Sequence, residues 1–226
     1  MSNFFFQQGA NGYLLEQFIN TNVNNTRNDD YAGPIENRAR LALEVLQAVT
    51  AEIGADRVAV RFSPFNAHYM PIGNSDPIGD YSWLLERVDK LGLAFVTLID
   101  PSADLFISGS ARMAKQYEAA AARGVPKDKV REAVSLKPFR KCLKNTLAFT
   151  SGGYDATNWA QPIRDGDFDG IVFGRQYISN PDLVERLRNG WPLATPDKKT
   201  FYTPGPTGYI DYSRWTEEEN DVKTIS

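Results

Sequence analysis

Hydrophobic residues follow two spacings along this chain, one typical of helices and one typical of buried strands. Apolar side chains recur at helical spacing over residues 41–53, and Gly54 stands where a helix would end. Residues 58–62 then form a short apolar run that predicts a buried strand. The same order of helix and strand is expected at 84–91 and 93–99, and again at 113–123 and 146–150. Alternating elements of this kind predict an α/β architecture with a parallel sheet.

The rest of the chain carries weaker signals of the same kind. We expect a looser helical stretch at 127–143, a shorter helix with Pro162 at 155–165 and a last strand at 168–173. A final helix is expected to begin at Asn180-Pro181 and to end at Gly190. The strand at 93–99 is almost wholly apolar, which predicts that both of its faces are covered. Hydrophobic spacing alone allows either a barrel or an open, doubly wound sheet.

Composition narrows the class of protein. The 226 residues are 42% hydrophobic and 23% charged, as in globular proteins. A formal net charge of -3 without a Lys/Arg cluster gives no reason to expect nucleic acid or an anionic membrane as partner. The single cysteine, Cys142, excludes an internal disulfide and is expected to be a small core residue rather than a nucleophile or metal ligand. No stretch approaches the roughly 20 apolar residues of a membrane span, and no secretory signal is visible. We therefore expect a cytoplasmic protein with a small-molecule ligand and no metal.

Two motifs near the start of the chain carry the most specific signal. They are Gln8-Gly9-Ala10-Asn11-Gly12-Tyr13-Leu14-Leu15 and Tyr31-Ala32-Gly33-Pro34-Ile35-Glu36-Asn37-Arg38-Ala39-Arg40, with Asn25-Thr26-Arg27 between them. Together they resemble the loop and helix after the fourth barrel strand in the old yellow enzyme family, whose members are FMN-dependent ene-reductases built on a (β/α)8 barrel. The resemblance extends from Gln8 to Tyr212 and favours the barrel over the open sheet.

This resemblance implies an incomplete (β/α)8 TIM barrel that lacks the first three strands and most of the fourth, because only seven residues precede the first motif. Residues 5–8 would form a stub of the fourth strand. We expect a single partial-barrel domain with three parts: residues 1–35 as strand-four stub and active-site loop, residues 36–190 as βα units and residues 191–226 as a C-terminal extension.

The resemblance also implies roles for residues of the first motif. Tyr13 matches the proton donor, which delivers a proton to the α-carbon of an α,β-unsaturated carbonyl substrate; outside this motif, a tyrosine would more often only pack a helix start. Asn11 matches a side chain that binds the substrate carbonyl oxygen. Gln8 stands where the family usually has histidine, and a neutral amide cannot carry a positive charge, so weaker stabilisation is expected. The only histidine, His68, lies in the loop after Arg61 and is expected at the surface.

Further residues match the cofactor site of the family, in which FMN is the cofactor and NADPH the reductant. Arg61 matches an arginine beside the flavin ring, although an ion pair at a strand end is an alternative role. Gly152-Gly153 and Gly174-Arg175 resemble the two strand-end loops that bind the FMN phosphate. Phe201-Tyr202 matches an aromatic pair that borders the flavin and substrate pocket, and a packed turn explains it equally well.

The missing first half of the barrel would normally supply part of the flavin site. We therefore expect a truncated oxidoreductase whose activity is lost or severely reduced, with an exposed half-barrel edge that favours self-association. An ancestral role in fungal secondary metabolism, as in the chanoclavine-aldehyde reductases of ergot alkaloid pathways, is a narrower expectation. Three alternatives stay open: activity restored by a second half-barrel, a non-catalytic binding or scaffold protein, and a misassigned gene start.

Overall fold

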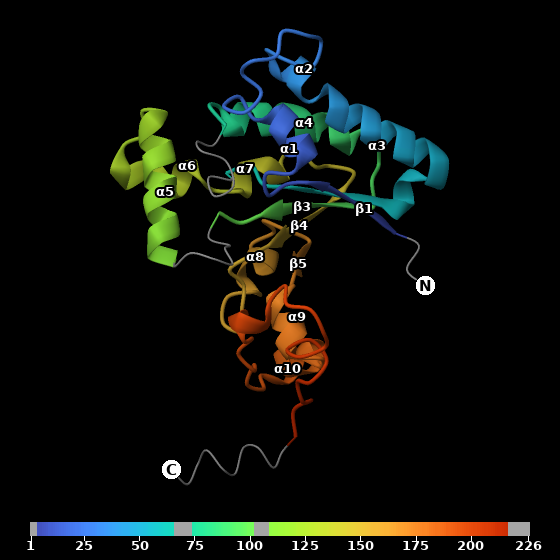
Figure 1. Cartoon of the computed structure of the whole chain (residues 1–226), viewed down its shortest axis with the longest axis vertical. Helices are drawn as coiled ribbons and strands as arrows, with labels where there is room; N and C mark the ends of the chain where they lie inside the picture. The colour runs from blue at the N-terminus through green and yellow to red at the C-terminus, as the bar shows by residue number, and fades with distance from the viewer. Residues whose placement is uncertain (1–3, 66–73, 102–108, 217–226) are drawn as a thin grey trace. The chain divides into compact units, whose positions relative to one another are not determined.

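The computed structural model describes residues 4–65, 74–101 and 109–216. They fall into two compact units, the first made of Met1–Gly153 with Pro162–Val172 and the second of Tyr154–Gln161 with Phe173–Ser226. Unit 1 contains a parallel sheet with helices, and unit 2 contains short helices and turns (Figure 1). The expected single domain and its internal boundaries stay a prediction.

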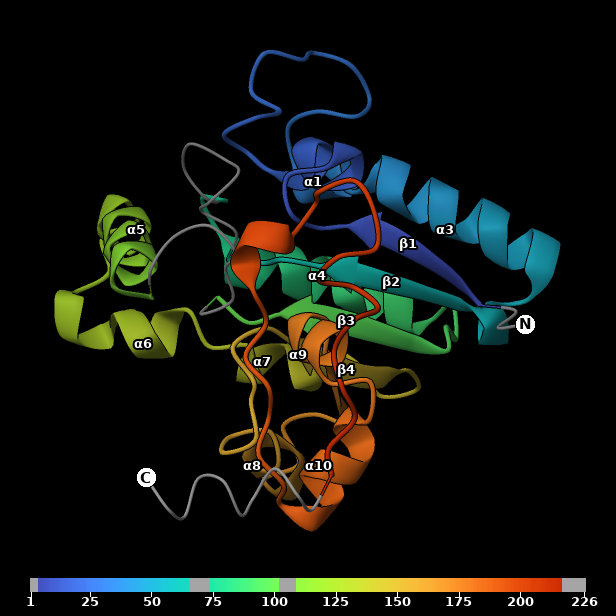
Figure 2. The same cartoon turned by 60° about the horizontal axis from the view of Figure 1, so that its bottom comes forward.

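Unit 1 is built on five parallel strands that pair in chain order. They are β1 (Phe5–Gly9), β2 (Val58–Phe62), β3 (Phe95–Ile99), β4 (Leu147–Ser151) and β5 (Gly170–Val172). Figure 2 shows β1 to β4 side by side in this order. The register places Gln8 beside Arg61, and Arg61 beside Thr97. All strands therefore end at the same edge of the sheet, which is the edge that carries ligand sites in β/α barrels.

Helices α3 and α4 lie on one face of this sheet (Figure 1). The helices of unit 1 before β4 are α1 (Leu14–Ile19), α2 (Ile35–Arg38), α3 (Arg40–Ile53), α4 (Pro77–Asp89), α5 (Gly109–Ala122), α6 (Val130–Ala133) and α7 (Lys137–Arg140), with short 3-10 turns η1 (Ala55–Arg57) and η2 (Lys127–Lys129). Leu46, Leu84 and Phe62 are fully buried in the core that these helices form with the sheet. A buried ion pair ties α2 to α4, because Nη2 of Arg38 lies 2.8 Å from each carboxylate oxygen of Asp80.

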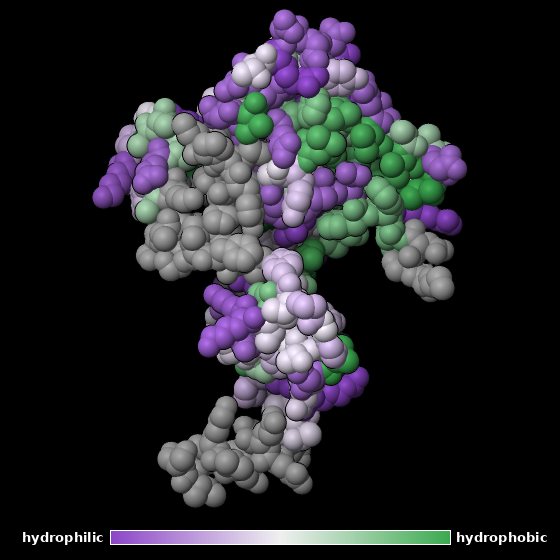
Figure 3. Space-filling model, in the orientation of Figure 1, coloured by the Kyte–Doolittle hydropathy of each residue, from purple (hydrophilic) through white to green (hydrophobic). Residues whose placement is uncertain are grey.

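The opposite face of the sheet carries aromatic side chains, which we call the aromatic face: Phe4, Phe6, Phe95 and Phe149. The Phe95 ring lies 5.7 Å from that of Phe6 and stacks on that of Phe149 at 4.9 Å, measured between centroids. Phe6 is 47% exposed, and Leu147 beside this cluster is 51% exposed. Figure 3 shows hydrophobic side chains gathered over α3 and the neighbouring β1 in unit 1. Unit 1 thus presents apolar side chains to solvent on the face without helices.

The stronger sequence signals are confirmed. The helix expected at 41–53 is α3, and Gly54 follows it with a φ of 91°, a conformation that favours glycine. The strand expected at 58–62 is β2, and the strand stub expected at 5–8 is β1 with one further residue. α4 begins earlier than its apolar pattern indicated, because Asp76 caps it by accepting the Gly79 N–H at 2.9 Å.

Three weaker predictions are wrong in extent. The helix expected at 155–165 is reduced to α8 (Gln161–Arg164), because the Asp155 carboxylate accepts the Thr157 N–H and forms a local turn instead. The stretch at 127–143 is broken into η2, α6 and α7, with Pro138 in the first turn of α7. The last strand is only β5, shorter than the expected 168–173.

Unit 2 contains α9 (Arg175–Ser179), α10 (Leu183–Asn189) and η3 (Lys198–Thr200). Asn180-Pro181 does not cap α10, contrary to the sequence prediction. The residue before α10 is Asp182, whose carboxylate instead binds Arg186 at 2.7 Å. The Asn180 side chain accepts the Ala194 N–H at 2.7 Å and donates to the Gln176 carbonyl at 2.8 Å, so it holds the following loop. Gly190 ends α10 in the left-handed conformation, as predicted.

Candidate active site

The carboxyl edge of the sheet in unit 1 brings together predicted site residues from three strands. Gln8 belongs to β1, Arg61 to β2, and Gly152-Gly153 follow β4 directly. Asn11 and Tyr13 lie in the turn between β1 and α1. The sequence prediction that these residues share one edge is consistent with the observed register.

Arg61 links the second and fourth strands of the sheet. Its Nη2 atom donates to the Ser151 hydroxyl at 3.4 Å, although the two residues are 90 positions apart in the chain. In the sheet register, Arg61 is also the partner of Gln8. A half-buried guanidinium therefore lies between the end of β1 and the end of β4, which is a suitable place for binding an anionic or carbonyl-bearing ligand.

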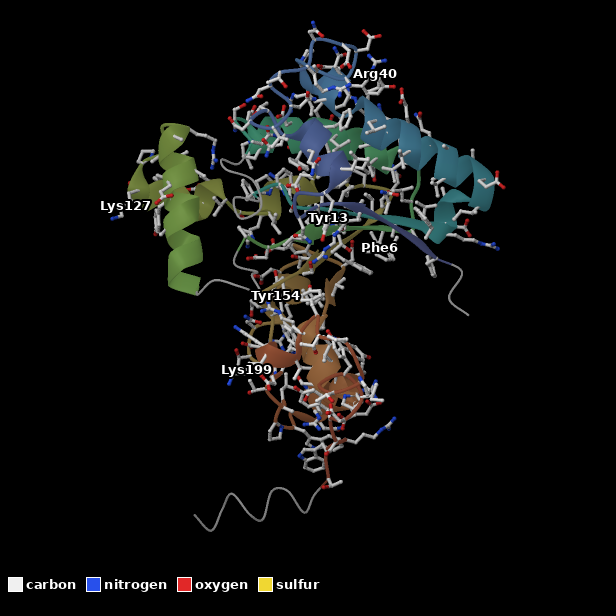
Figure 4. All side chains as sticks on the ribbon, viewed as in Figure 1. Phe6, Tyr13, Arg40, Lys127, Tyr154 and Lys199 are labelled. Carbon is white, nitrogen blue, oxygen red and sulfur yellow. The ribbon has the colours of Figure 1, made fainter. Side chains whose placement is uncertain are left out.

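The turn between β1 and α1 presents Asn11 and Tyr13. Asn11 has a φ of 58° and Gly12 a φ of 80°, so two successive residues are left-handed. The Asn11 N–H donates to the Ser63 hydroxyl at the end of β2, at 2.9 Å. The Tyr13 side chain is exposed beside the sheet (Figure 4). Because left-handed non-glycine residues persist only where their surroundings hold them, this turn is a fixed feature of the site.

The loop after β4 has the backbone of a tight glycine turn. Gly152 and Gly153 have φ values of 97° and 70°, which side-chain-bearing residues rarely adopt. The turn follows Ser151, the residue that Arg61 contacts. Consecutive glycines here allow the backbone to approach a ligand at the strand end closely.

Unit 2 contains the remaining predicted residues. Gly174 has an ordinary φ of -109°, and a Cβ built on it would meet no heavy atom within 4 Å. Gly174 is exposed, so this open space is solvent. Arg175 begins α9; burial lowers the pKa of its guanidinium, and nearby Tyr202 opposes that shift. Because Gly152-Gly153 belong to unit 1 and Gly174-Arg175 to unit 2, the joint phosphate site stays a prediction.

Tyr202 shares a backbone property with Asn11. These two are the non-glycine residues with positive φ among the described positions, and the φ of Tyr202 is 60°. The Tyr202 N–H donates to the hydroxyl of Tyr209 at 2.7 Å, which holds the turn, and Phe201 beside it is half-buried. Both positive-φ residues were predicted to bind substrate, and strained backbone of this kind concentrates at functional sites.

Sequence reasoning missed three polar residues that support this edge. Ser63 and Ser151 stand at the ends of β2 and β4 and contact Asn11 and Arg61, respectively. Glu16, in the first turn of α1, accepts the Gly12 N–H at 2.6 Å. Position at a strand end was the available signal for the two serines, whereas no local pattern indicated Glu16. His68, expected at the surface, lies outside the described residues.

The described residues contain neither a cluster of metal-ligating side chains nor a helix suited to span a membrane. Within residues 4–65, 74–101 and 109–216, no group of three or more His, Cys, Asp and Glu side chains is arranged to hold a metal ion. In the same part of the chain, no helix combines the length and the apolar character needed to cross a bilayer. Cys142 is half-buried against the core, and burial raises the pKa of its thiol, which disfavours the reactive thiolate.

Five parallel strands that pair in chain order and are joined by helices form part of a β/α barrel. Proteins with this fold carry their active sites at the carboxyl edge of the strands, where the polar and glycine residues described above lie. The sequence profile of the NADH:flavin oxidoreductase / NADH oxidase family matches residues 7–194. The chain belongs to this family.

Two curated relatives illustrate the similarity. The chain is 36% identical over 218 residues to 12-oxophytodienoate reductase 1 of Oryza sativa subsp. japonica, covering 96% of this chain and 51% of the relative. It is 38% identical over 214 residues to flavin oxidoreductase hxnT of Emericella nidulans, covering 90% and 52%. The chain thus spans about half the length of the curated relatives it matches.

Solved structures agree with the sequence relatives. The old yellow enzyme from Trypanosoma cruzi matches with a TM-score of 0.76 at 28% identity, over 95% of this chain and 50% of that one. Morphinone reductase matches with a TM-score of 0.76 at 32% identity, over 96% and 51%. The resemblance to old yellow enzymes and the prediction of a partial barrel are both confirmed.

Proposed function

We propose that this chain carries part of the active site of an FMN-dependent reductase of α,β-unsaturated carbonyl compounds, with NADPH as the reductant. The observation that carries this proposal is the convergence of three strand ends in unit 1. The turn with Asn11 and Tyr13 binds the end of β2, and Arg61 of β2 reaches Ser151 at the end of β4. Membership of the flavin oxidoreductase family supports the choice of cofactor and reaction.

The proposed reaction adds a hydride and a proton across the activated double bond of the substrate. FMN, when bound and reduced, supplies the hydride to the β-carbon. Tyr13 donates its phenolic proton to the α-carbon and regains a proton from solvent, to which it is exposed. The amide side chains of Asn11 and Gln8 donate hydrogen bonds to the carbonyl oxygen, where negative charge develops.

Each unit, taken by itself, carries residues suited to the cofactor. In unit 1, Arg61 would place its positive charge beside the flavin, and Gly152-Gly153 would offer backbone N–H groups to the phosphate. In unit 2, Gly174-Arg175 would bind phosphate, and Phe201-Tyr202 would border a flavin ring. The left-handed glycines after β4 fit a close approach of the backbone to a phosphate.

The isolated chain would have lost most or all of this reductase activity. β1 and β5 are the outer strands of the sheet, and the aromatic face exposes Phe6 to solvent. Three further strands would complete an eight-stranded barrel. Efficient FMN binding and turnover would therefore require a complementary half-barrel.

The role of Arg61 is tested by FMN binding. We expect Arg61→Ala to weaken FMN binding by about 10- to 100-fold, because a charge-assisted hydrogen bond of roughly 1.5–3 kcal/mol is lost. Quenching of flavin fluorescence during titration with the protein measures the dissociation constant. Arg57→Ala is the matched control, because Arg57 is exposed just before the opposite end of β2. Equal affinities of the two variants would contradict the assignment.

The proposed reaction is tested by NADPH oxidation in the presence of 2-cyclohexenone, a simple α,β-unsaturated ketone. We expect slow turnover whose rate per chain rises with protein concentration or on addition of a complementary half-barrel. Stoichiometric binding of FMN and fast turnover by the dilute monomer would contradict the proposed impairment of activity.

A cytoplasmic location and a secondary-metabolite substrate of the ergot-alkaloid type also belong to the proposal. The sequence resemblance and the composition support them.

A further inference from the structure

The turn that carries Asn11 and Tyr13 is held by a buried carboxylate. Glu16 is 2% exposed and uses both of its oxygens. Its Oε2 atom accepts the Gly12 N–H at 2.6 Å, and its Oε1 atom accepts the Ser63 hydroxyl proton at 2.9 Å. The oxygen of Ser63 in turn accepts the Asn11 N–H at 2.9 Å. One side chain therefore holds two successive backbone amides, Gly12 directly and Asn11 through Ser63.

These contacts join three elements at the candidate site. Glu16 belongs to α1, Ser63 follows β2, and the turn itself follows β1. Gln17 contacts the other polar group of Gly12, because its side-chain amide donates to the Gly12 carbonyl at 2.7 Å. The peptide groups on both sides of Gly12 are thus engaged. A turn with φ values of 58° and 80° at Asn11 and Gly12 keeps one geometry only if such contacts hold it.

We infer that Glu16, acting partly through Ser63, is a positioning residue for the substrate-binding turn. The roles of Asn11 and Tyr13 toward substrate rest on the proposed function, whereas the hydrogen-bond network stands independently of it. The network also restricts how a carbonyl oxygen is bound. Because the Asn11 and Gly12 N–H groups are already engaged by Ser63 and Glu16, hydrogen bonds from this turn to the substrate come from the Asn11 side chain and not from these two amides.

Backbone amide hydrogen exchange of the full chain, followed by NMR, tests this inference. In Glu16→Gln, we expect exchange at Gly12 or Asn11 to accelerate at least tenfold, because a carboxamide has one acceptor oxygen in place of two. In Ser63→Ala, we expect acceleration at Asn11 but not at Gly12. Glu36→Gln, which alters an exposed glutamate of α2, is the matched control and should change neither amide.

A second readout reports the position of the Tyr13 side chain itself. In protein labelled with 3-fluorotyrosine, the Tyr13 fluorine resonance is assigned by its loss in Tyr13→Phe. We expect Glu16→Gln to shift or narrow this resonance and to leave that of Tyr209 unchanged. A role in stability alone would instead lower the midpoint of thermal unfolding and accelerate exchange throughout α1 and β2.

Three results would overturn the inference: unchanged exchange at both amides in Glu16→Gln, equal acceleration of both in Ser63→Ala, or an unmoved Tyr13 resonance. None of these measurements requires FMN, NADPH or substrate. Failure to bind FMN would therefore refute the proposed function without changing the exchange pattern, so the two failures are distinguishable.

Discussion

Thr97 has a buried hydroxyl without a hydrogen-bond partner among the described residues. The side chain is 0% exposed and lies in β3, next in register to Arg61 of β2 and Phe149 of β4. A buried hydroxyl that makes no hydrogen bond loses its hydration without compensation, at a cost of about 1–3 kcal/mol. We therefore expect this residue to lower stability in the same row of the sheet that carries the candidate flavin contact.

Replacing this hydroxyl by a methyl group is expected to stabilise the protein. Thr97→Val keeps the shape of the side chain, and we expect it to raise the free energy of unfolding by about 1 kcal/mol. Urea denaturation followed by circular dichroism measures the change. Thr150→Val is the control, because Thr150 is equally buried and its hydroxyl is not among the unpartnered groups; this variant should lose stability. A less stable Thr97→Val protein would show that water satisfies the hydroxyl.

At the scale of elements, a carboxylate at the end of α4 holds the start of β4. Oδ1 of Asp89 accepts the N–H groups of Asn145 and Thr146 at 2.8 and 3.0 Å, and Oδ2 accepts the Asn145 side-chain amide at 3.0 Å. Burial alone would raise the pKa of Asp89, but hydrogen bonds donated by the backbone of residues 144–146 outweigh it and lower the pKa. The charged carboxylate therefore stabilises the connection between helix and strand.

This lowered pKa predicts a loss of stability in acid. The carboxylate contributes stability above the ordinary Asp pKa of about 3.9, and the contribution is lost as the pH falls through the lower folded-state pKa. At neutral pH, Asp89→Asn should cost about 1–3 kcal/mol, because a buried N–H loses its acceptor. This difference from the unmodified protein should shrink when urea denaturation is repeated near the folded-state pKa. Asp128→Asn, at an exposed position, should show no such pH-dependent difference.

At the scale of the whole molecule, the aromatic face is expected to drive self-association. Contiguous exposed apolar side chains and open sheet edges favour association with other chains. Phe6 of β1 lies on this face, and it is 47% exposed. A charged side chain at this position would have to be buried in any interface that covers the face, which is unfavourable.

Sedimentation velocity at several protein concentrations tests this expectation. The unmodified chain should sediment faster as concentration rises, whereas Phe6→Glu should sediment as a monomer over the same range. Ile210→Glu, at an exposed apolar residue of unit 2, is the control and should still associate. Association of Phe6→Glu equal to that of the control would contradict a role for the aromatic face.

The amino-acid sequence by itself determined the elements whose signals are local. α3 and β2 follow from apolar spacing and from Gly54, because helical and strand periodicity are set by neighbouring residues. The first motif likewise identified Asn11 and Tyr13. The helix expected at 155–165 was wrong in extent, because the Asp155 side chain forms a local turn before α8.

Only the tertiary structure decided how these residues are held together. Arg61 and Ser151 meet across 90 positions because the register of β2, β3 and β4 aligns their strand ends. Ser63 reaches Asn11 for the same reason, and Glu16 completes the network from α1. Local periodicity contains no information on contacts between distant segments, since these arise from sheet register and from the burial of polar groups that must find partners. The sequence thus indicated the candidate residues, whose roles stay a prediction, whereas the hydrogen bonds that hold Asn11 and Arg61 in place came only from the tertiary structure.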